Sequence, residues 1–287
     1  MGFFVSSLII SIHYLSKSIS SGNRFIYSVG KIKNYNDISA FLQNVFDINI
    51  NVIDKVFESY SNNNSEFSKI HSKLSKLEKI NVAPNRLSND DGKILYSIIR
   101  IKNPKNIIET GVATGYSSSI VLMALNENHH GLLTSIDYPN YKGLLKKINR
   151  DITHKGFTDT FFSYHGIRSI GGYILRPNYY HIPNGEESGW VVPKRFKKKW
   201  ILNIGLSSKL LKSELKKLKE IDIFFHDSDH SKNNMLYEFE TAWPFINNNG
   251  FIISDDINLN NAFEEFCKKV PFKKAAMFDN SFGIIVK

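Results

Sequence analysis

Cysteine is almost absent from this sequence, because Cys267 is the single one among 287 residues. One cysteine excludes a disulfide within the chain and a zinc site built from several cysteines. A reducing compartment such as the cytoplasm fits this scarcity. Acidic residues are also a minority, 27 against 37 lysines and arginines, for a net charge of +10. No RNA-binding module or zinc knuckle accompanies this charge, so we expect a solvated basic surface and no nucleic-acid partner.

A long apolar run is missing at the N-terminus. The apolar part of residues 1–20 is confined to residues 3–15, and a bilayer-spanning helix needs about 20 residues. This stretch also lacks the basic start and the A-x-A-like end of a secretory signal. We therefore expect a helix that contacts a membrane peripherally or packs on a partner, for example in a homodimer; a signal anchor is the alternative.

A glycine turn is present at residues 107–118, but it lacks two well-known fingerprints. Gly111 is followed by Ala113 and then Gly115, so neither the dinucleotide pattern G-x-G-x-x-G nor a G-K-[ST] phosphate loop occurs here. An apolar run ending in Glu109 leads into the turn, and a helical pattern follows from Ser117. This order predicts a strand, a tight turn and a helix that together bind a nucleotide-like cofactor, although many glycine turns serve backbone geometry alone.

Three further apolar runs end in carboxylates. Asp137 closes the run from Leu133, Asp227 follows the run from Ile221, and the pair Asp255 and Asp256 follows the run from Phe251. Parallel strands have their carboxyl ends at one edge of the sheet, so we expect these acids to meet there. Asp137 has the position of an acid that binds ribose hydroxyls; the alternative is that it begins a turn.

The combination of these motifs resembles the class I S-adenosylmethionine-dependent methyltransferases. The glycine turn is similar to their motif I, and the acid-ended strands resemble the branch with catechol and caffeoyl-coenzyme A O-methyltransferases and cephalosporin-biosynthesis proteins. The methyltransferase domain 24 group is the best match. This resemblance implies that Asp227, Asp255 and Asp256 bind a divalent cation. It also puts a base, often lysine in the relatives, at the position of His230.

Elementary chemistry supports the roles that the resemblance implies. Three converging carboxylates repel one another, and a hard cation such as Mg²⁺ relieves that repulsion. An imidazole with an ordinary pKa near 6.5 can remove a proton from a metal-held hydroxyl at neutral pH, which would make His230 and Asp227 the catalytic pair. The alternative is that Asp229 and His230 only cap the next helix. We expect a packing role for His226, which lies within the strand.

The resemblance also implies the other cofactor contacts. The cofactor, S-adenosylmethionine, is expected along the glycine turn, the ribose acid and the strand end near residue 204. The residues expected to bind it are Glu109, Gly111, Ala113, Gly115, Ser117, Asp137, Asn203, Gly205, Ser207 and Asp227. An insertion at about residues 138–199 precedes that last strand, and a loop of this length usually binds or covers a ligand. Trp190 within it would stack on a ligand or fill the core.

The fold class follows as α/β. We expect a Rossmann-like, seven-stranded methyltransferase sheet with an antiparallel last strand and helices on both faces, over residues 85–287. Residues 1–84 should form a helical N-terminal region, because apolar residues recur at helical spacing from Asn36 to Lys79. Ser88 should cap the next helix, and residues 273–287 should form a terminal hairpin.

The sequence thus predicts a cytoplasmic S-adenosylmethionine-dependent methyltransferase with metal-assisted O-methylation of a small-molecule or glycan hydroxyl. Two other classes compete with this prediction. One is a non-catalytic binding or scaffold protein on the same fold, since fold alone does not establish activity. The other, less favoured, is a nucleotide-dependent oxidoreductase.

Overall fold

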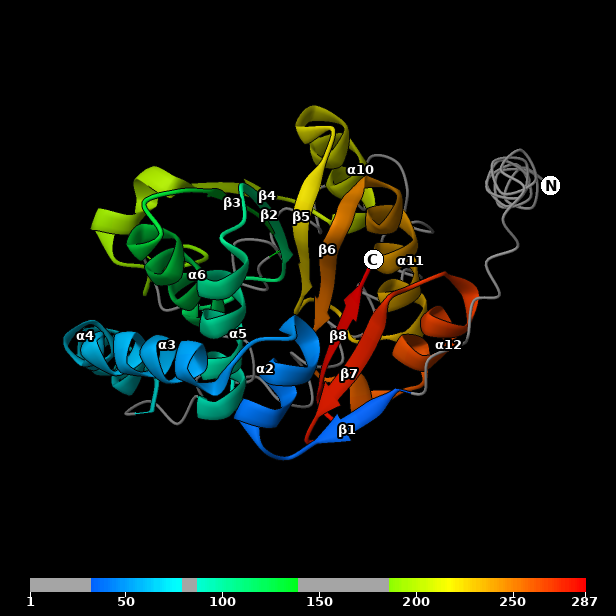
Figure 1. The fold of residues 1–287 in the computed structure, drawn as a ribbon. Coiled ribbons are helices and arrows are strands. Elements are labelled where there is room, and N and C mark those ends of the chain that lie inside the picture. Colours follow the sequence, from blue (N-terminus) through cyan, green and yellow to red (C-terminus); the bar gives the residue numbers. More distant parts are fainter. Residues whose placement is uncertain (1–31, 79–86, 139–185) are drawn as a thin grey trace, which may run out of the picture. The chain divides into compact units, whose positions relative to one another are not determined.

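The computed structural model describes residues 32–78, 87–138 and 186–287. Its centre is an eight-stranded sheet in the order β1-β7-β8-β6-β5-β2-β3-β4 (Figure 1). The strands are β1 Lys33–Tyr35, β2 Asn106–Thr110, β3 Leu132–Asp137, β4 Trp200–Ile204, β5 Ile221–His226, β6 Ile246–Ser254, β7 Lys274–Phe278 and β8 Phe282–Val286. β8 is antiparallel to both of its neighbours, and all other pairings are parallel. The α/β sheet with an antiparallel last strand is therefore confirmed.

The sheet has one strand more than the sequence predicts. β1 pairs in parallel with β7, with Lys33 opposite Ala276. The strand is only three residues long and mostly exposed, so it lacks the alternation of buried and exposed residues by which strands are recognised in a sequence. Its backbone finds partners because β7 would otherwise be the exposed edge of the sheet.

Helices cover both faces of the sheet (Figure 1). The α-helices are α2 Ile38–Phe46, α3 Ile50–Asn62, α4 Asn64–Glu78, α5 Asn89–Lys102, α6 Tyr116–Glu127, α10 Ser207–Leu218, α11 Lys232–Ala242 and α12 Ala262–Lys269, and the short 3₁₀ helices are η1 Lys194–Lys199, η2 Trp243–Phe245 and η3 Ile257–Leu259. One apolar cluster packs the five helices from α2 through α6 against one face of the sheet. A second cluster packs α10, α11 and α12 against the other face. Two cores thus hold the sheet between two helical layers.

Two local predictions about the helices and the hairpin are confirmed. The Ser88 side chain accepts the amide hydrogen of Asp91 and caps α5. At the other end of the chain, β7 and β8 form a hairpin whose turn residues Asp279 and Asn280 both have positive φ. Asp and Asn tolerate this backbone region better than most residues, so the turn matches its sequence.

The predicted helical region before residue 85 forms α2, α3 and α4 in its described part. These helices belong to the same compact unit as the sheet, Lys31–Lys287. Phe41 of α2 stacks edge-on against Phe278 of β7, with ring centroids 6.0 Å apart. The predicted apolar segment 1–20 and most of the insertion, residues 139–185, lie outside the described residues. No helix within the described ranges is long and apolar enough to cross a bilayer.

Candidate active site

The glycine turn connects β2 to α6 at the carboxyl edge of the sheet. Gly111 has φ +87° and Gly115 has φ +90°, a backbone region in which side chains are strained. A Cβ on Gly111 would lie 1.9 Å from the carbonyl oxygen of Asp227, and one on Gly115 would lie 2.6 Å from Cα of Gly189. Ala113 also has positive φ, at 47°. The two glycines therefore let the turn pack closely against two other loops, and their contact with a cofactor stays a prediction.

Glu109 lies fully buried beneath this turn. Its carboxylate accepts hydrogen bonds from the hydroxyls of Ser117 at 2.9 Å, Ser118 at 2.6 Å and Ser135 at 2.6 Å. Ser135 in turn accepts the indole hydrogen of Trp200 at 2.8 Å. Burial raises the pKa of Glu109 to about 7, although the three hydroxyls oppose that rise. Glu109 thus ties β2, β3 and α6 together, and the predicted cofactor contacts of Glu109 and Ser117 remain untested.

Asp137 ends β3 beside the glycine turn, as predicted. One carboxylate oxygen accepts the amide hydrogen of Val112 at 3.1 Å, and the other accepts the hydroxyl of Ser188. Burial raises the pKa of Asp137, while these hydrogen bonds lower it. Ser188 was not among the predicted site residues, because nothing in a loop sequence identifies its partner 51 positions earlier.

Ser188 belongs to a short segment, Glu187–Val192, which we call the strap. The strap lies on the glycine turn through two main-chain hydrogen bonds, from Gly189 to the carbonyl of Ala113 at 2.9 Å and from Val191 to that of Thr114 at 3.1 Å. From α4, the Lys73 ammonium donates to the Trp190 and Val191 carbonyls, at 3.2 and 3.3 Å. The described end of the predicted insertion thus contacts the predicted cofactor turn directly.

Asp227 and Asp255 follow the neighbouring parallel strands β5 and β6. The amide of Asp227 donates to the carbonyl of Thr110 at 2.9 Å, and that of Asp255 donates to the carbonyl of His226 at 3.0 Å. Burial and the charge of Asp255 raise the pKa of Asp227 well above its usual range. Burial and the charge of Asp256 likewise raise the pKa of Asp255 to about 7. The predicted meeting of these acids at one edge is confirmed.

His230 lies among these acids. Its Nε2 is 4.0 Å from Oδ1 of Asp227, and its Nδ1 is 3.8 Å from Oδ2 of Asp256. The alternative interpretation, helix capping, applies to its neighbours. Ser231 caps α11 by accepting the amide hydrogen of Asn234 at 3.4 Å, and its own hydroxyl donates to Asp229 at 2.9 Å. The imidazole thus lies between two of the predicted metal ligands, and its role as a base stays a prediction.

The described residues contain no ready-made metal cluster. No group of three or more histidine, cysteine, aspartate or glutamate side chains in these ranges is arranged to hold an ion. Asp255 and Asp256 both raise the pKa of Asp227, Asp256 also raises that of Asp255, and the oxygens of all three have the chemistry that Mg²⁺ prefers. The metal site therefore stays a prediction, which the chemistry of the three carboxylates supports.

The end of β4 supplies the remaining predicted cofactor residues, Asn203, Gly205 and Ser207. The amide of Gly205 donates to the carbonyl of Asp137 at 2.8 Å, which joins the ends of β4 and β3. Ser207 begins α10, and its side chain helps to lower the pKa of the Glu238 carboxyl. Asn203 lies within β4. These residues are near the site, and their contact with a cofactor stays a prediction.

Comparison with known families bears on this arrangement. A family model described as "Methyltransferase domain" matches residues 108–257, just over half of the chain, from β2 to the start of η3. The chain belongs to this methyltransferase family. A second model, described as "O-methyltransferase", matches residues 59–155. The predicted membership in the methyltransferase domain 24 group is confirmed.

Several solved structures similar to this methyltransferase have a ligand in their description, among them the following three. An O-methyltransferase from Bacillus cereus in complex with SAH is 15% identical, with 88% of this chain and 98% of that one covered and a TM-score of 0.43. TomG of Streptomyces achromogenes, an O-methyltransferase of tomaymycin synthesis with SAM, is 13% identical, with 88% and 95% covered and a TM-score of 0.44. Cofactor-bound Rv0187 from MTB is 11% identical, with 76% and 89% covered and a TM-score of 0.48. The family assignment does not depend on these three likenesses. No curated protein matches the sequence.

Two residues of this methyltransferase have a larger role than the sequence predicts. His226 is buried and packs on Phe239, as expected for a packing residue, but its Nδ1 also lies 2.6 Å from Oε2 of Glu238. Glu238 is fully buried and was not a predicted site residue. One signal could have revealed it: on α11, Glu238 shares the inward face with Met235, Phe239 and Ala242. A charged residue on that face requires a partner.

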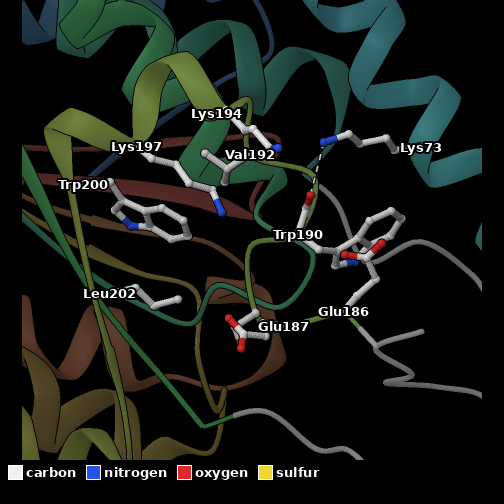
Figure 2. Close-up of a pocket in the computed structure, with 10 residues that line it drawn as sticks. Lys73, Glu186, Glu187, Trp190, Val192, Lys194, Lys197, Trp200 and Leu202 are labelled. Carbon is white, nitrogen blue, oxygen red and sulfur yellow. Dashed lines mark hydrogen bonds between the residues drawn. The ribbon is translucent and has the colours of Figure 1, made fainter. Parts of the chain in front are cut away.

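A cavity of about 520 Å³ opens beside the strap of the methyltransferase (Figure 2). Trp190 and Trp200 border it, and Ser188 lines it while bonded to Asp137. Figure 2 shows the Lys73 ammonium reaching the main chain of Trp190 at this place. Trp190 is 8% exposed and belongs to the apolar cluster on the α6 side, so of its two expected roles the core-filling one is observed.

Proposed function

We propose that this methyltransferase transfers a methyl group from S-adenosylmethionine to a hydroxyl oxygen. One observation carries the proposal: at the carboxyl ends of the parallel strands β2, β3, β5 and β6 lie the glycine turn, Asp137, Asp227, Asp255 and His230. Ligands of open α/β sheets bind outside this edge. The family membership supplies the reaction class.

The cofactor is proposed to lie along the turn from Gly111 to Ser117, with its ribose at Asp137 and its adenine near Asn203, Gly205 and Ser207. A sulfonium cation suits this place, because Asp227 carries a raised pKa among other acids and gains from a nearby positive charge. The turn needs no phosphate-binding pattern for such a ligand, which agrees with the absent dinucleotide fingerprint. Glu109 supports the turn from beneath through its three serine partners.

A divalent cation is proposed to bind to Asp227, Asp255 and Asp256. The donor set fits, because these are hard oxygen ligands, and the charges of Asp255 and Asp256 raise the pKa of Asp227. When bound, the cation would make an acceptor hydroxyl more acidic. His230, between Asp227 and Asp256, is proposed to accept the hydroxyl proton, and Asp227 to orient the imidazole.

Binding of S-adenosylhomocysteine, measured by calorimetry, tests the cofactor. We expect binding in the micromolar range and none for a nicotinamide dinucleotide. The reverse result would point to the oxidoreductase class. Binding without transfer of labelled methyl groups to any acceptor extract would favour the non-catalytic scaffold instead. Excess chelator tests the cation separately, since full turnover in its presence would remove the metal from the mechanism and leave the methyltransferase assignment intact.

The acceptor is proposed to be a small molecule or a glycan with a free hydroxyl, and no nucleic acid. Labelled cofactor incubated with fractionated extracts tests this, because the modified compound carries the label.

The N-terminal residues 3–15 lie outside the described residues. We propose that they contact a membrane surface reversibly, as a single short apolar segment can. Co-sedimentation with liposomes should be stronger for the full chain than for a chain starting at Asn36. Equal partitioning would make the segment a packing or homodimer element of a cytoplasmic enzyme.

A further inference from the structure

Glu238 on α11 collects hydrogen bonds from several segments that end at the candidate active site. Its Oε2 accepts from Thr110 Oγ1 at 2.5 Å and from His226 Nδ1 at 2.6 Å. Its Oε1 accepts from Ser228 Oγ at 2.9 Å and from Asn234 Nδ2 at 3.1 Å. One fully buried carboxylate thus connects the ends of β2 and β5, the loop after β5 and the start of α11.

Two of these partners stand directly beside the site. Thr110 immediately precedes Gly111, the first glycine of the cofactor turn, and Ser228 immediately follows Asp227. The two segments touch above Glu238, because a Cβ on Gly111 would lie 1.9 Å from the Asp227 carbonyl oxygen and 2.8 Å from Cα of Ser228. The backbone of the glycine turn and that of the loop after β5 are therefore packed directly against each other.

The loop after Asp227 is held by the same network. Asn234 donates to Ser228 Oγ at 3.1 Å and to the carbonyl oxygen of Asp229 at 2.9 Å, besides Glu238. The His226 ring stands edge-on to that of His230, with centroids 5.1 Å apart. The network therefore defines the path of the chain from Asp227 to His230.

We propose that Glu238 is a positioning residue, the common acceptor that fixes the glycine turn at Gly111 against the Asp227–His230 loop. It does not reach the edge where ligands would bind, since it is fully buried, and it acts through Thr110 and Ser228. The effect on the cofactor rests on the proposed function, whereas the effect on the loop does not.

The sharpest test removes one hydrogen bond to Glu238 at a time. Ser228→Ala removes the direct hydrogen bond from the loop to Glu238 and leaves Glu238 its other donors, Asn234 among them, and Ser228→Thr keeps the hydroxyl. Thr110→Val cuts the connection to β2 at nearly constant shape. Glu240→Gln is the matched control, because Glu240 lies two residues along α11 in an exposed ion pair with Lys269.

Hydrogen exchange of residues 227–231 is the first measurement, with the melting temperature alongside. In Ser228→Ala we expect exchange in this loop to rise roughly tenfold, with the melting temperature within about 3 °C of the wild type and the β7–β8 hairpin unchanged. Ser228→Thr and Glu240→Gln should match the wild type. Unchanged loop exchange in Ser228→Ala, or a uniform rise across the whole sheet, would overturn the proposal and leave Glu238 as an ordinary core residue.

Calorimetry with S-adenosylhomocysteine is the second measurement. Ser228→Ala and Thr110→Val should each weaken binding about three- to tenfold, and Ser228→Thr should restore it. Equal affinity in all variants would overturn the coupling of Glu238 to the glycine turn. A wild-type protein that binds no S-adenosylhomocysteine would refute the proposed cofactor, and the exchange measurement would still decide whether Glu238 positions the loop.

Discussion

Glu109 and Glu238 are two fully buried glutamates near the same edge of the sheet, yet their pKa values move in opposite directions. Burial raises the pKa of Glu109 to about 7, and three serine hydroxyls offset this only in part. Burial acts on Glu238 as well, but the charge of His226 and the surrounding donors hold its pKa at about 2. The partners of Glu238, which include an imidazole, thus compensate its burial more than three hydroxyls compensate the burial of Glu109.

The comparison extends to the acids that would bind ligands. Asp227 and Asp255 resemble Glu109, because burial and neighbouring carboxylates raise the pKa of both. A site that binds a cation needs acids whose charge no protein group already balances. Glu238, which lies beneath these acids, already has its partners within the protein. The inner glutamates therefore support the fold, whereas under the proposed mechanism the edge acids act on a ligand.

Replacing Glu238 by leucine should give the largest loss of stability. The change leaves His226 and Thr110 buried without their acceptor, so we expect the free energy of unfolding to fall by about 3–5 kcal/mol at pH 7. Urea denaturation measures this. Because the folded pKa of Glu238 lies below the unfolded one, its contribution is present above about pH 4.5 and is lost as the pH falls toward 2. A loss below about 1 kcal/mol would contradict the contrast with Glu109.

Replacing Glu109 by glutamine should have an effect that depends on pH. The folded pKa of about 7 lies above the unfolded value of 4.5, so the wild type loses stability as the pH rises from 4.5 to 7. The variant has no such titration. Its free energy of unfolding should therefore rise relative to the wild type by about 3 kcal/mol across this window. Denaturation curves at pH 4.5, 6 and 8 provide the measurement, and a constant difference would refute the raised pKa.

Replacing Asp255 by asparagine separates stability from activity. The neutral side chain removes a repulsive charge, so we expect a gain of about 2 kcal/mol at pH 8, less than a fully buried group would give. Under the proposed mechanism methyl transfer should fall roughly a hundredfold, since a metal ligand is lost, while S-adenosylhomocysteine still binds. A stabilised variant with full activity would place Asp255 outside the mechanism.

Replacing Ser135 by alanine should have the smallest effect of the series. It removes one of the three donors to Glu109 and leaves the Trp200 indole without its acceptor, so we expect a loss of about 1 kcal/mol. Denaturation at pH 5, where Glu109 is largely protonated, should show a smaller loss than at pH 8. The exposed Glu240→Gln variant should stay within about 0.5 kcal/mol of the wild type in all these measurements.

The parts of the fold that are visible in the sequence are those with local patterns. The glycine turn, the acids after β3, β5 and β6, the Ser88 cap and the terminal hairpin follow from residue spacing and from the rule that parallel strands end at one edge. β1 escaped prediction because three exposed residues carry no alternation. Its pairing depends on the neighbouring edge of β7, which only the folded sheet provides.

The acids of the candidate site could be predicted from the sequence, whereas the residues that hold them in place could not. The positions of Asp227 and Asp255 follow from strand ends. The partners of Glu238 are up to 128 positions away in the sequence, and Ser188 lies 51 positions from Asp137. Such contacts arise from tertiary packing, so residue spacing contains no signal for them.

The strap has a consequence for how the protein can be observed. The chain has three tryptophans, and two of them, Trp190 and Trp200, border the strap cavity, while Trp243 packs against Phe266 on the opposite face of the sheet. The Trp200 indole is one hydroxyl away from Glu109 at the base of the glycine turn. Intrinsic fluorescence should therefore follow any displacement of Ser188 from Asp137 against a constant Trp243 background. The protein carries its own optical reporter of the glycine turn.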